Sequence, residues 1–339
     1  MLNSMAVKAF GNGTECDPKI FSVFLTSSME IIETWNIYLY IFVMLIGSGF
    51  NVLCLWIVSK SNVFHHNLKC PIWWTVFAWF ELVASKILLI IYQLMYLKNN
   101  PEQQSMDGIL LLAWSGSMHY HFVYSVMAAP LVVIIERGFA TFFVFDYEKK
   151  RRCWILILIL LMQNTFSWIL TIFTLLNTLT YIEASIVGLS VSLVASIAFA
   201  YLKEFNEKKL HYVEKHARDL RFNLSTRYQL RENLKTFRMI IKLFFLCLIL
   251  LIACISMKTI PMISSLPDET KLLFRRITDM IIHAGPIYVT VCLIVAVDDY
   301  TNICRSILGM KKTSRVSPVP ILKKMESDVY FEQFKMAIE

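Results

Sequence analysis

Seven long runs of apolar residues organise the chain. A helix needs about 20 residues to cross a hydrocarbon core of about 30 Å, because lipid offers no hydrogen-bond partner to a free backbone group. The runs cover residues 35–58, 71–97, 109–135, 153–176, 181–202, 239–260 and 277–297. The pattern predicts an all-α membrane protein whose seven transmembrane helices form one bundle over residues 35–297.

The composition supports this interpretation. Hydrophobic residues make up 57% of the 339 residues and charged residues 17%, whereas soluble proteins average about 45–50% and about 25%. A water-soluble fold is therefore excluded. The net charge of +8 would suggest nucleic-acid binding in a soluble protein, but here the position of the charges decides its meaning, and no nucleic-acid partner is expected.

The basic residues are concentrated on one side of the predicted membrane. Of 33 Lys and Arg, 24 lie in four segments and six in the alternate ones. Basic residues accumulate on the cytoplasmic side of membrane proteins, so we expect an outside N-terminus and an inside C-terminus. Residues 1–34 then form an extracellular tail. The basic segments, which would also face anionic membrane lipids, are residues 59–70, 136–152, 203–238 and 298–339.

Two candidate modification sites lie outside the spans. Asn12 begins the sequon Asn12-Gly13-Thr14 in the predicted external tail, where N-glycosylation is expected. Cys304 lies in residues 300–308, whose apolar stripe predicts a short amphipathic helix on the inner leaflet. Two interpretations of Cys304 stay open, a palmitoylation site and an ordinary free thiol.

Nothing in the sequence indicates an enzyme. It contains no Walker loop, no G-x-S-x-G and no H-E-x-x-H motif. The neighbouring histidines, His65-His66 and His119-x-His121, fall on different faces of a helix and have no completing Cys or carboxylate. We therefore expect no catalytic residue, no metal and no cofactor.

Glu136 and Arg137 lie at the predicted cytoplasmic end of the third span. In one interpretation the arginine reaches toward water and headgroups and only anchors the helix. In the other, the two residues are the acid–arginine pair that holds seven-helix receptors in the closed state. When the bundle opens, the arginine is released and can contact a G protein. The position in the third of seven helices favours the second interpretation.

A family resemblance begins at the same residues. The stretch ERGFATFFVFDYE, residues 136–148, resembles the third-helix signature of the Sre (class epsilon) nematode serpentine chemoreceptors. Residues 201–209 and 224–236 are similar to the long third cytoplasmic loop of that family. The resemblance implies a G-protein-coupled chemosensory receptor in the plasma membrane, on the cilia of sensory neurons. Its implied partners are a heterotrimeric G protein and a small-molecule ligand.

The chain departs from the rhodopsin-like pattern. Asn51 resembles the first-helix asparagine of that class, and Glu81 lies where it keeps a buried aspartate. The seventh span has Gly285-Pro286-Ile287-Tyr288 in place of Asn-Pro-x-x-Tyr, and no cysteine lies at the outer end of the third span. The detailed activation switch of the rhodopsin-like class is therefore not carried over.

The long basic segment has helical signals of its own. Residues 203–219 continue the fifth helix with alternating charges, and Thr226-x-x-Gln229 is a capping box that would begin the next helix. The ten basic residues of the segment suit an acidic face of a G protein. The alternative is that they only fix the topology and attract anionic lipid.

Ionisable residues inside spans are candidates for ligand binding. Asp279 and His283 are four residues apart and so share a face of the seventh helix. Glu81 and Lys86 are five apart, so each is expected to pair with a neighbouring helix and not with the other. Further candidates are aromatic or polar-tipped rings, for which plain packing is the alternative: Tyr92, Trp114, His119, Tyr120, Trp168 and Tyr181.

A different function class remains open. The alternative is a membrane transporter or a ligand-gated channel. Transporters tend to show inverted repeats and broken helices at the midplane, and here we find no repeat and little mid-span Gly or Pro. A receptor is therefore the favoured interpretation.

Overall fold

The computed structural model describes eight stretches of the chain, which are helical almost throughout and contain no strand. They are residues 34–60, 66–97, 106–143, 153–176, 178–215, 223–263, 266–296 and 298–307. The helices are α3 (Thr34–Lys60), α4 (His66–Tyr92) with a π-helical turn η1 (Gln93–Leu97), α5 (Met106–Phe142), α6 (Cys153–Leu175), α7 (Tyr181–Lys215), α8 (Asn223–Ile263), α9 (Asp268–His283), α10 (Gly285–Ala296) and α11 (Asp298–Ile307).

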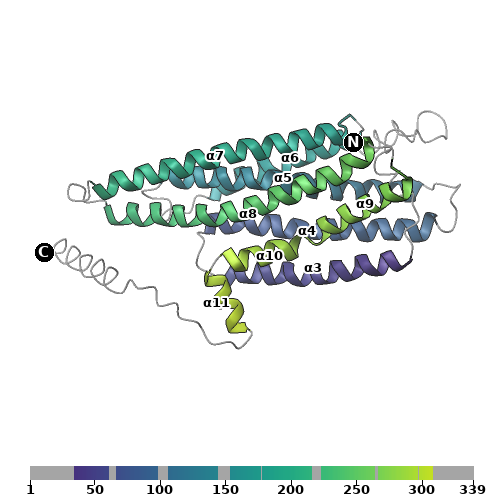
Figure 1. The fold of residues 1–339 in the computed structure, drawn as a ribbon, viewed down its shortest axis with the longest axis horizontal. Coiled ribbons are helices and arrows are strands. Elements are labelled where there is room, and N and C mark those ends of the chain that lie inside the picture. The colour runs from purple at the N-terminus through teal and green to yellow at the C-terminus, as the bar shows by residue number, and fades with distance from the viewer. Residues whose placement is uncertain are drawn as a thin grey trace.

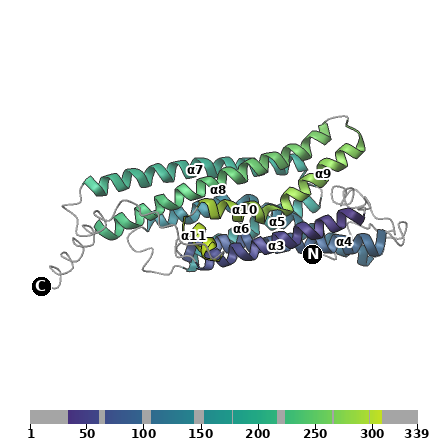
Figure 2. The same cartoon turned by 60° about the horizontal axis from the view of Figure 1, so that its bottom comes forward.

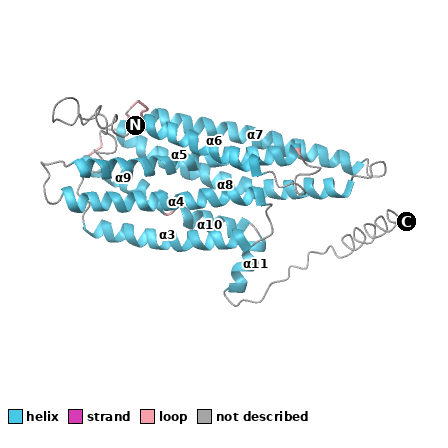
Figure 3. Cartoon of the chain, turned by 180° about the vertical axis from the view of Figure 1, so that it is seen from behind, coloured by secondary structure: helices cyan, strands magenta, loops and turns pink. Residues whose placement is uncertain are grey.

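The helices α3 to α10 lie side by side in one elongated bundle (Figures 1 and 3). Among the described residues, six helices are long and apolar enough to cross a membrane, and α9 and α10 meet the same criteria only as a pair. Large apolar side chains such as Leu45, Ile249 and Val295 are exposed on the bundle surface, as a surface in contact with lipid requires. The predicted all-α fold with up to seven apolar spans is confirmed.

The seventh span differs from its prediction as one run over residues 277–297. It begins at Asp268 and is broken at Ala284, where α9 and α10 meet at a bend of 45°. Pro286 explains the break, because proline has no backbone N–H to donate and its ring clashes with the preceding turn. Two backbone hydrogen bonds lie at the break. The Ala284 N–H donates to the Met280 carbonyl at 2.9 Å, and the Ile287 N–H donates to the Ala284 carbonyl at 3.0 Å.

Helices α7 and α8 extend well beyond the rest of the bundle at one end (Figures 1 and 2). We call this the basic end, because residues 203–238 carry ten Lys and Arg. The predicted continuation of the fifth helix is confirmed as far as Lys215. The capping-box prediction was wrong in its start, because α8 begins at Asn223 and Thr226 is buried inside the helix.

The extended pair is held together at its tip. The Oε1 atom of Glu214 on α7 lies 3.4 Å from Arg227 Nε and 3.1 Å from Arg231 Nη2, both on α8. Further down, Phe199 and Phe237 pack edge to face with ring centroids 5.1 Å apart. The Glu214 contacts and the buried packing of Val213 of α7 on Leu230 of α8 therefore join the two helices at their tip.

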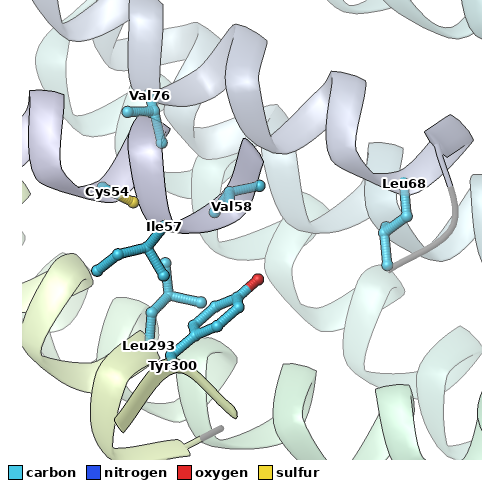
Figure 4. Packing of buried hydrophobic residues seen from close by; sticks show 7 residues of the cluster. All are labelled: Cys54, Ile57, Val58, Leu68, Val76, Leu293 and Tyr300. Carbon is cyan, nitrogen blue, oxygen red and sulfur yellow. The ribbon is translucent and has the colours of Figure 1, made fainter. Parts of the chain in front are cut away.

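A cluster of buried residues closes the basic end of the other helices. Figure 4 shows the Tyr300 ring of α11 beside Leu293 of α10 and Ile57 of α3, and Tyr300 is fully buried. This ring fixes α11 across the ends of α3 and α10, so that it turns away from the bundle (Figure 1). The other members of the cluster are Cys54, Val58, Leu68 and Val76.

Of the two candidate modification sites, only Cys304 lies within the described residues. Asn12 lies outside the described residues. Cys304 lies on α11 and is half-buried against the Tyr300 cluster. Burial raises the pKa of the Cys304 thiol, which lowers its thiolate fraction and therefore its reactivity. The structure thus gives the free-thiol interpretation its physical support, and palmitoylation of Cys304 stays a prediction.

Gly47 on α3 lies where the helix closely approaches two neighbours. A Cβ atom added there would lie 2.8 Å from the Trp79 ring of α4 and 3.3 Å from the His283 carbonyl oxygen at the α9–α10 break. Glycine therefore lets α3 pack directly against both neighbours. Two residues along the same helix, a Cβ at Gly49 would meet nothing within 4 Å.

Gly47→Ala is expected to destabilise the fold by about 1–3 kcal/mol, the usual cost of overpacking a tight contact. The matched Gly49→Ala exchange should leave stability unchanged or raise it, since alanine is about 1 kcal/mol better than glycine inside a helix. The measurement is the apparent melting temperature of the purified protein in detergent at a fixed scan rate. Equal melting temperatures for the two variants would contradict the close packing.

Candidate functional site

A buried ion pair joins α4 to α9 in the half of the bundle away from the basic end. The Lys86 ammonium donates a hydrogen bond to Asp279 Oδ2. The same Nζ atom lies 3.9 Å from the ring centroid of Tyr40 on α3, in a cation–π arrangement. The Lys86 side chain is only 7% exposed. Three helices therefore meet at one ammonium group.

His283 completes this cluster, which we call the Lys86 cluster: Lys86, Asp279, His283 and Tyr40. Its Nδ1 lies 2.7 Å from the Asp279 carbonyl oxygen and 3.5 Å from Asp279 Oδ1. Its ring packs edge to face on Tyr40, with centroids 5.9 Å apart. The i, i+4 spacing correctly placed Asp279 and His283 together. The carboxylate also hydrogen-bonds to the ammonium of Lys86, a partner that the sequence did not identify.

The expectation that Glu81 and Lys86 pair with other helices is confirmed. Lys86 pairs with Asp279 of α9, and Glu81 Oε2 lies 2.6 Å from His121 Nδ1 of α5. The two side chains leave α4 in different directions, about 140° apart for five residues. This divergence follows from the spacing alone, whereas the partners depend on how the helices pack.

Two more of the predicted residues, His119 and Tyr120, lie on α5. His119 is close enough to Lys86, Asp279 and His283 to interact with them electrostatically. Tyr120 packs edge to face on His119 at 5.5 Å. The α5 helix thus brings an imidazole to the Lys86 cluster from a fourth direction.

Two of the remaining aromatic candidates, Trp114 and Trp168, are not gathered around that cluster. Tyr92 is buried near the end of α4. Trp114 is 47% exposed and Trp168 41% exposed, both on the outside of the bundle. Trp168 stacks on His121 with ring centroids 4.6 Å apart. The side chain of Tyr181 lies outside the described residues. The pocket of gathered aromatic rings that the sequence suggested is therefore not formed by Trp114 and Trp168.

At the basic end, Glu136 and Arg137 form a second buried link. Arg137 Nε donates to Glu136 Oε2 at 2.5 Å and Nη2 donates to Glu136 Oε1 at 2.7 Å, a bidentate pair. The remaining nitrogen, Nη1, donates to the Asn233 side-chain oxygen of α8 at 3.2 Å. This Arg137 cluster (Glu136, Arg137 and Asn233) connects the third span to the sixth.

The expectation that Arg137 faces water and headgroups was wrong. Its exposed fraction is 4% and that of Glu136 is 1%. The cause is the length of the helices: α5 continues to Phe142, and α7 and α8 run past it on the same side. Buried charges of this kind require a partner, and Glu136 supplies it.

A neighbouring hydrogen bond between an amide and a hydroxyl group joins α5 to α7. Asn206 Nδ2 donates to Thr141 Oγ1 at 2.9 Å, and Asn206 is fully buried. Neither Asn206 nor Asn233 was a candidate, although each is an uncharged amide in a stretch of charged residues. The contrast between each amide and its charged neighbours was the feature of the sequence that could have identified these two residues. The two clusters are therefore polar links between helices, one near each end of the bundle, and either can be broken by moving one helix.

Within the described ranges, no three His, Cys, Asp or Glu side chains gather closely enough to hold a metal ion. The polar groups are instead spread as pairs between helices. The arrangement suits recognition and helix movement.

Comparison with known proteins gives a consistent result. A family model described as Sre G protein-coupled chemoreceptor matches residues 13–339. Serpentine receptor class epsilon-21 of Caenorhabditis elegans is 23% identical over 335 residues, which cover 95% of this chain and 90% of the relative. Serpentine receptor class epsilon-45 of the same organism is 24% identical over 322 residues, covering 84% and 86%.

The family match spans both clusters and all of the apolar helices. It confirms the resemblance to the Sre family. A bundle with up to seven apolar spans agrees with membership of a seven-helix receptor family. The chain belongs to the Sre family of G protein-coupled chemoreceptors.

Proposed function

We propose that this chemoreceptor binds a small external ligand and activates a heterotrimeric G protein from the basic end of its bundle. The N-terminus is outside and the C-terminus inside, because 24 of 33 basic residues then lie in the cytoplasm. The receptor acts in the plasma membrane, on the cilia of sensory neurons. The observation that carries the proposal is the Arg137 cluster, which ties the third span to the sixth at the cytoplasmic side.

The structure has the features of a closed state. Arg137 is neutralised by Glu136 and held to α8 by Asn233, so no free charge faces the cytoplasm at this point. If α8 moves away from α5, the hydrogen bond to Asn233 breaks and the guanidinium becomes accessible to a G protein. The basic faces of α7 and α8 supply a surface for the same partner.

The Lys86 cluster is the proposed ligand site. In this orientation it lies in the outer half of the bundle. A ligand with a charged or polar group competes with Lys86 for Asp279, or with Asp279 for Lys86, and so loosens α9 from α4. Such a ligand shifts the closed–open equilibrium only by the difference between its affinities for the two states.

The α9–α10 break connects this site to the rest of the bundle. His283 is the last residue of α9, and its carbonyl faces Gly47 of α3. A change at Asp279 therefore acts next to the bend, where α10 can reorient. A broken helix is also a feature of transporters, but the family favours the receptor.

The first prediction concerns topology. An epitope placed on residues 1–34 should be labelled by antibody on intact cells, and one placed on residues 331–339 only after permeabilisation. Basic residues retained in the cytoplasm are the physical reason. Each tagged chain is compared with a cytosolic marker that reports membrane integrity. The reverse labelling pattern would remove the proposed site of G-protein contact.

The second prediction concerns the Arg137 cluster. Asn233→Ala should raise basal G-protein signalling roughly tenfold or more, since a hydrogen bond to a charged group contributes about 1.5–3 kcal/mol. Arg137→Gln combined with Glu136→Gln should abolish activation while leaving no unpaired buried charge. Gly49→Ala is the control, because a Cβ at that position of α3 meets nothing within 4 Å and the residue belongs to neither cluster. The readout is nucleotide exchange normalised to surface protein.

Unchanged basal signalling in Asn233→Ala, with normal activation in the double variant, would show that the cluster only anchors the helix end.

The third prediction concerns the Lys86 cluster, with an agonist found by screening volatile and water-soluble odorants. Asp279→Asn should weaken agonist potency at least about tenfold, or about 1.4 kcal/mol, at an unchanged maximal response. His283→Ala should act in the same direction, and the double variant should lose less than the sum because the side chains are in contact. Trp114→Phe should not shift potency, since that side chain lies on the outside.

The measurement is a dose–response curve normalised to surface protein. Full potency in both single variants would exclude this cluster as the ligand site.

A further inference from the structure

A second pair of ionisable side chains lies between α4, α5 and α6, away from the Lys86 cluster. Glu81 Oε2 of α4 is 2.6 Å from His121 Nδ1 of α5, and the Trp168 ring of α6 stacks on the imidazole at 4.6 Å. Neither half of the proposed receptor mechanism uses Glu81 or His121. Unlike Lys86 and Arg137, which are buried, Glu81 is partly exposed on the surface of the bundle.

His121 is buried but only half satisfied. Its side chain is 4% exposed and its Nδ1 bonds to Glu81. Its Nε2 atom is buried and has no hydrogen-bond partner among the described residues. Buried polar atoms in proteins are rarely left in this condition without a ligand, a water or a functional role.

Glu81 faces outward. Its side chain is 32% exposed, and within the described part of the chain only its Oε2 has a hydrogen-bond partner. Phe77, one helical turn away, is 59% exposed. Four residues of helix turn back to within about 40° of the starting direction. The second carboxylate oxygen, Oε1, therefore lies at the edge of the lipid-facing side of α4.

The depth of Glu81 makes this oxygen unusual. The apolar span of α4 runs from Leu68 to Met95, so Glu81 lies near its middle. A carboxylate oxygen without a donor is strongly unfavourable at that depth. The aromatic rings of Phe77 and Trp168 flank the position and are both exposed. A polar acceptor thus lies between two apolar surfaces that a lipid-dissolved molecule can reach.

We propose that Glu81, His121 and Trp168 form a binding site for a membrane-dissolved amphiphile with a hydroxyl headgroup, which enters sideways from the bilayer. The hydroxyl donates a hydrogen bond to Glu81 Oε1, and the apolar body lies against Phe77 and Trp168. An alcohol suits the site better than an amine. It supplies the missing donor without bringing a further charge into the middle of the span.

The proposal can be tested by fluorescence with the full-length receptor in lipid nanodiscs. The probe is a terminally brominated undecanol, because bromine quenches a tryptophan that it contacts. Saturable quenching is expected in the native receptor and should be lost in Trp168→Phe, which removes the reporting ring but no hydrogen bond. Bromo-undecane, which lacks the hydroxyl, should give only the linear quenching of a molecule that partitions into lipid.

Removing the acceptor provides the second arm. Glu81→Leu should abolish saturable quenching or raise the half-saturating concentration at least about tenfold. Ser85→Ala is the matched control: Ser85 lies one turn along the same helix and bonds to Ser115 of α5, so its loss should leave binding intact. If Glu81→Leu does not fold, the comparison of Trp168→Phe with the native receptor still decides.

Two outcomes would overturn the proposal. One is saturable quenching that persists in Trp168→Phe or in folded Glu81→Leu, which would place the alcohol elsewhere. The other is saturation by bromo-undecane at the same concentrations, which would remove the role of the hydroxyl. The assay measures binding without a G protein, so its result is independent of whether the receptor signals as proposed.

Discussion

The need to neutralise every charge that lies inside the membrane governs this structure. Lipid provides neither water nor counter-ions, so each ionisable side chain of the spans must find its partner on another helix or beside itself. Lys86 of α4 forms an ion pair with Asp279 of α9, and Arg137 forms one with the adjacent Glu136. The first pair links α4 to α9, and Asn233 links the second pair to α8. The same requirement makes them sensitive to any molecule that brings a competing charge.

Much of the fold could be predicted because it depends on local properties of the sequence. Apolar run length gave the spans, and alternating charge gave the continuation of the fifth helix to Lys215. Where the local signal was ambiguous, the prediction failed. The apolar run around Pro286 is continuous in the sequence and was predicted as one helix. The structure shows instead a break at Ala284. Thr226 had the residue type of a cap, yet the helix begins at Asn223.

The candidate sites were predictable only in part, because partners are decided by packing over long sequence distances. Asp279 and His283 were found because four residues bring two side chains to one helix face. Lys86 lies 193 residues from Asp279, and no periodicity connects them. Burial of Arg137 was missed for a related reason. It depends on Asn233 and on two helices that extend past the membrane, whereas its position at a span end indicated water and headgroups.

The long α7–α8 pair has a mechanical consequence. Residues 203–215 extend the fifth helix by roughly 20 Å at 1.5 Å per residue, and Glu214 joins its tip to Arg227 and Arg231. A tilt of about 10° at the membrane surface would therefore carry the tip sideways by about 3.5 Å over that length. Because the two tips are joined, they travel together. The extension acts as a lever arm, which converts a helix movement too small to open a gap inside the bundle into a displacement about as large as an atom.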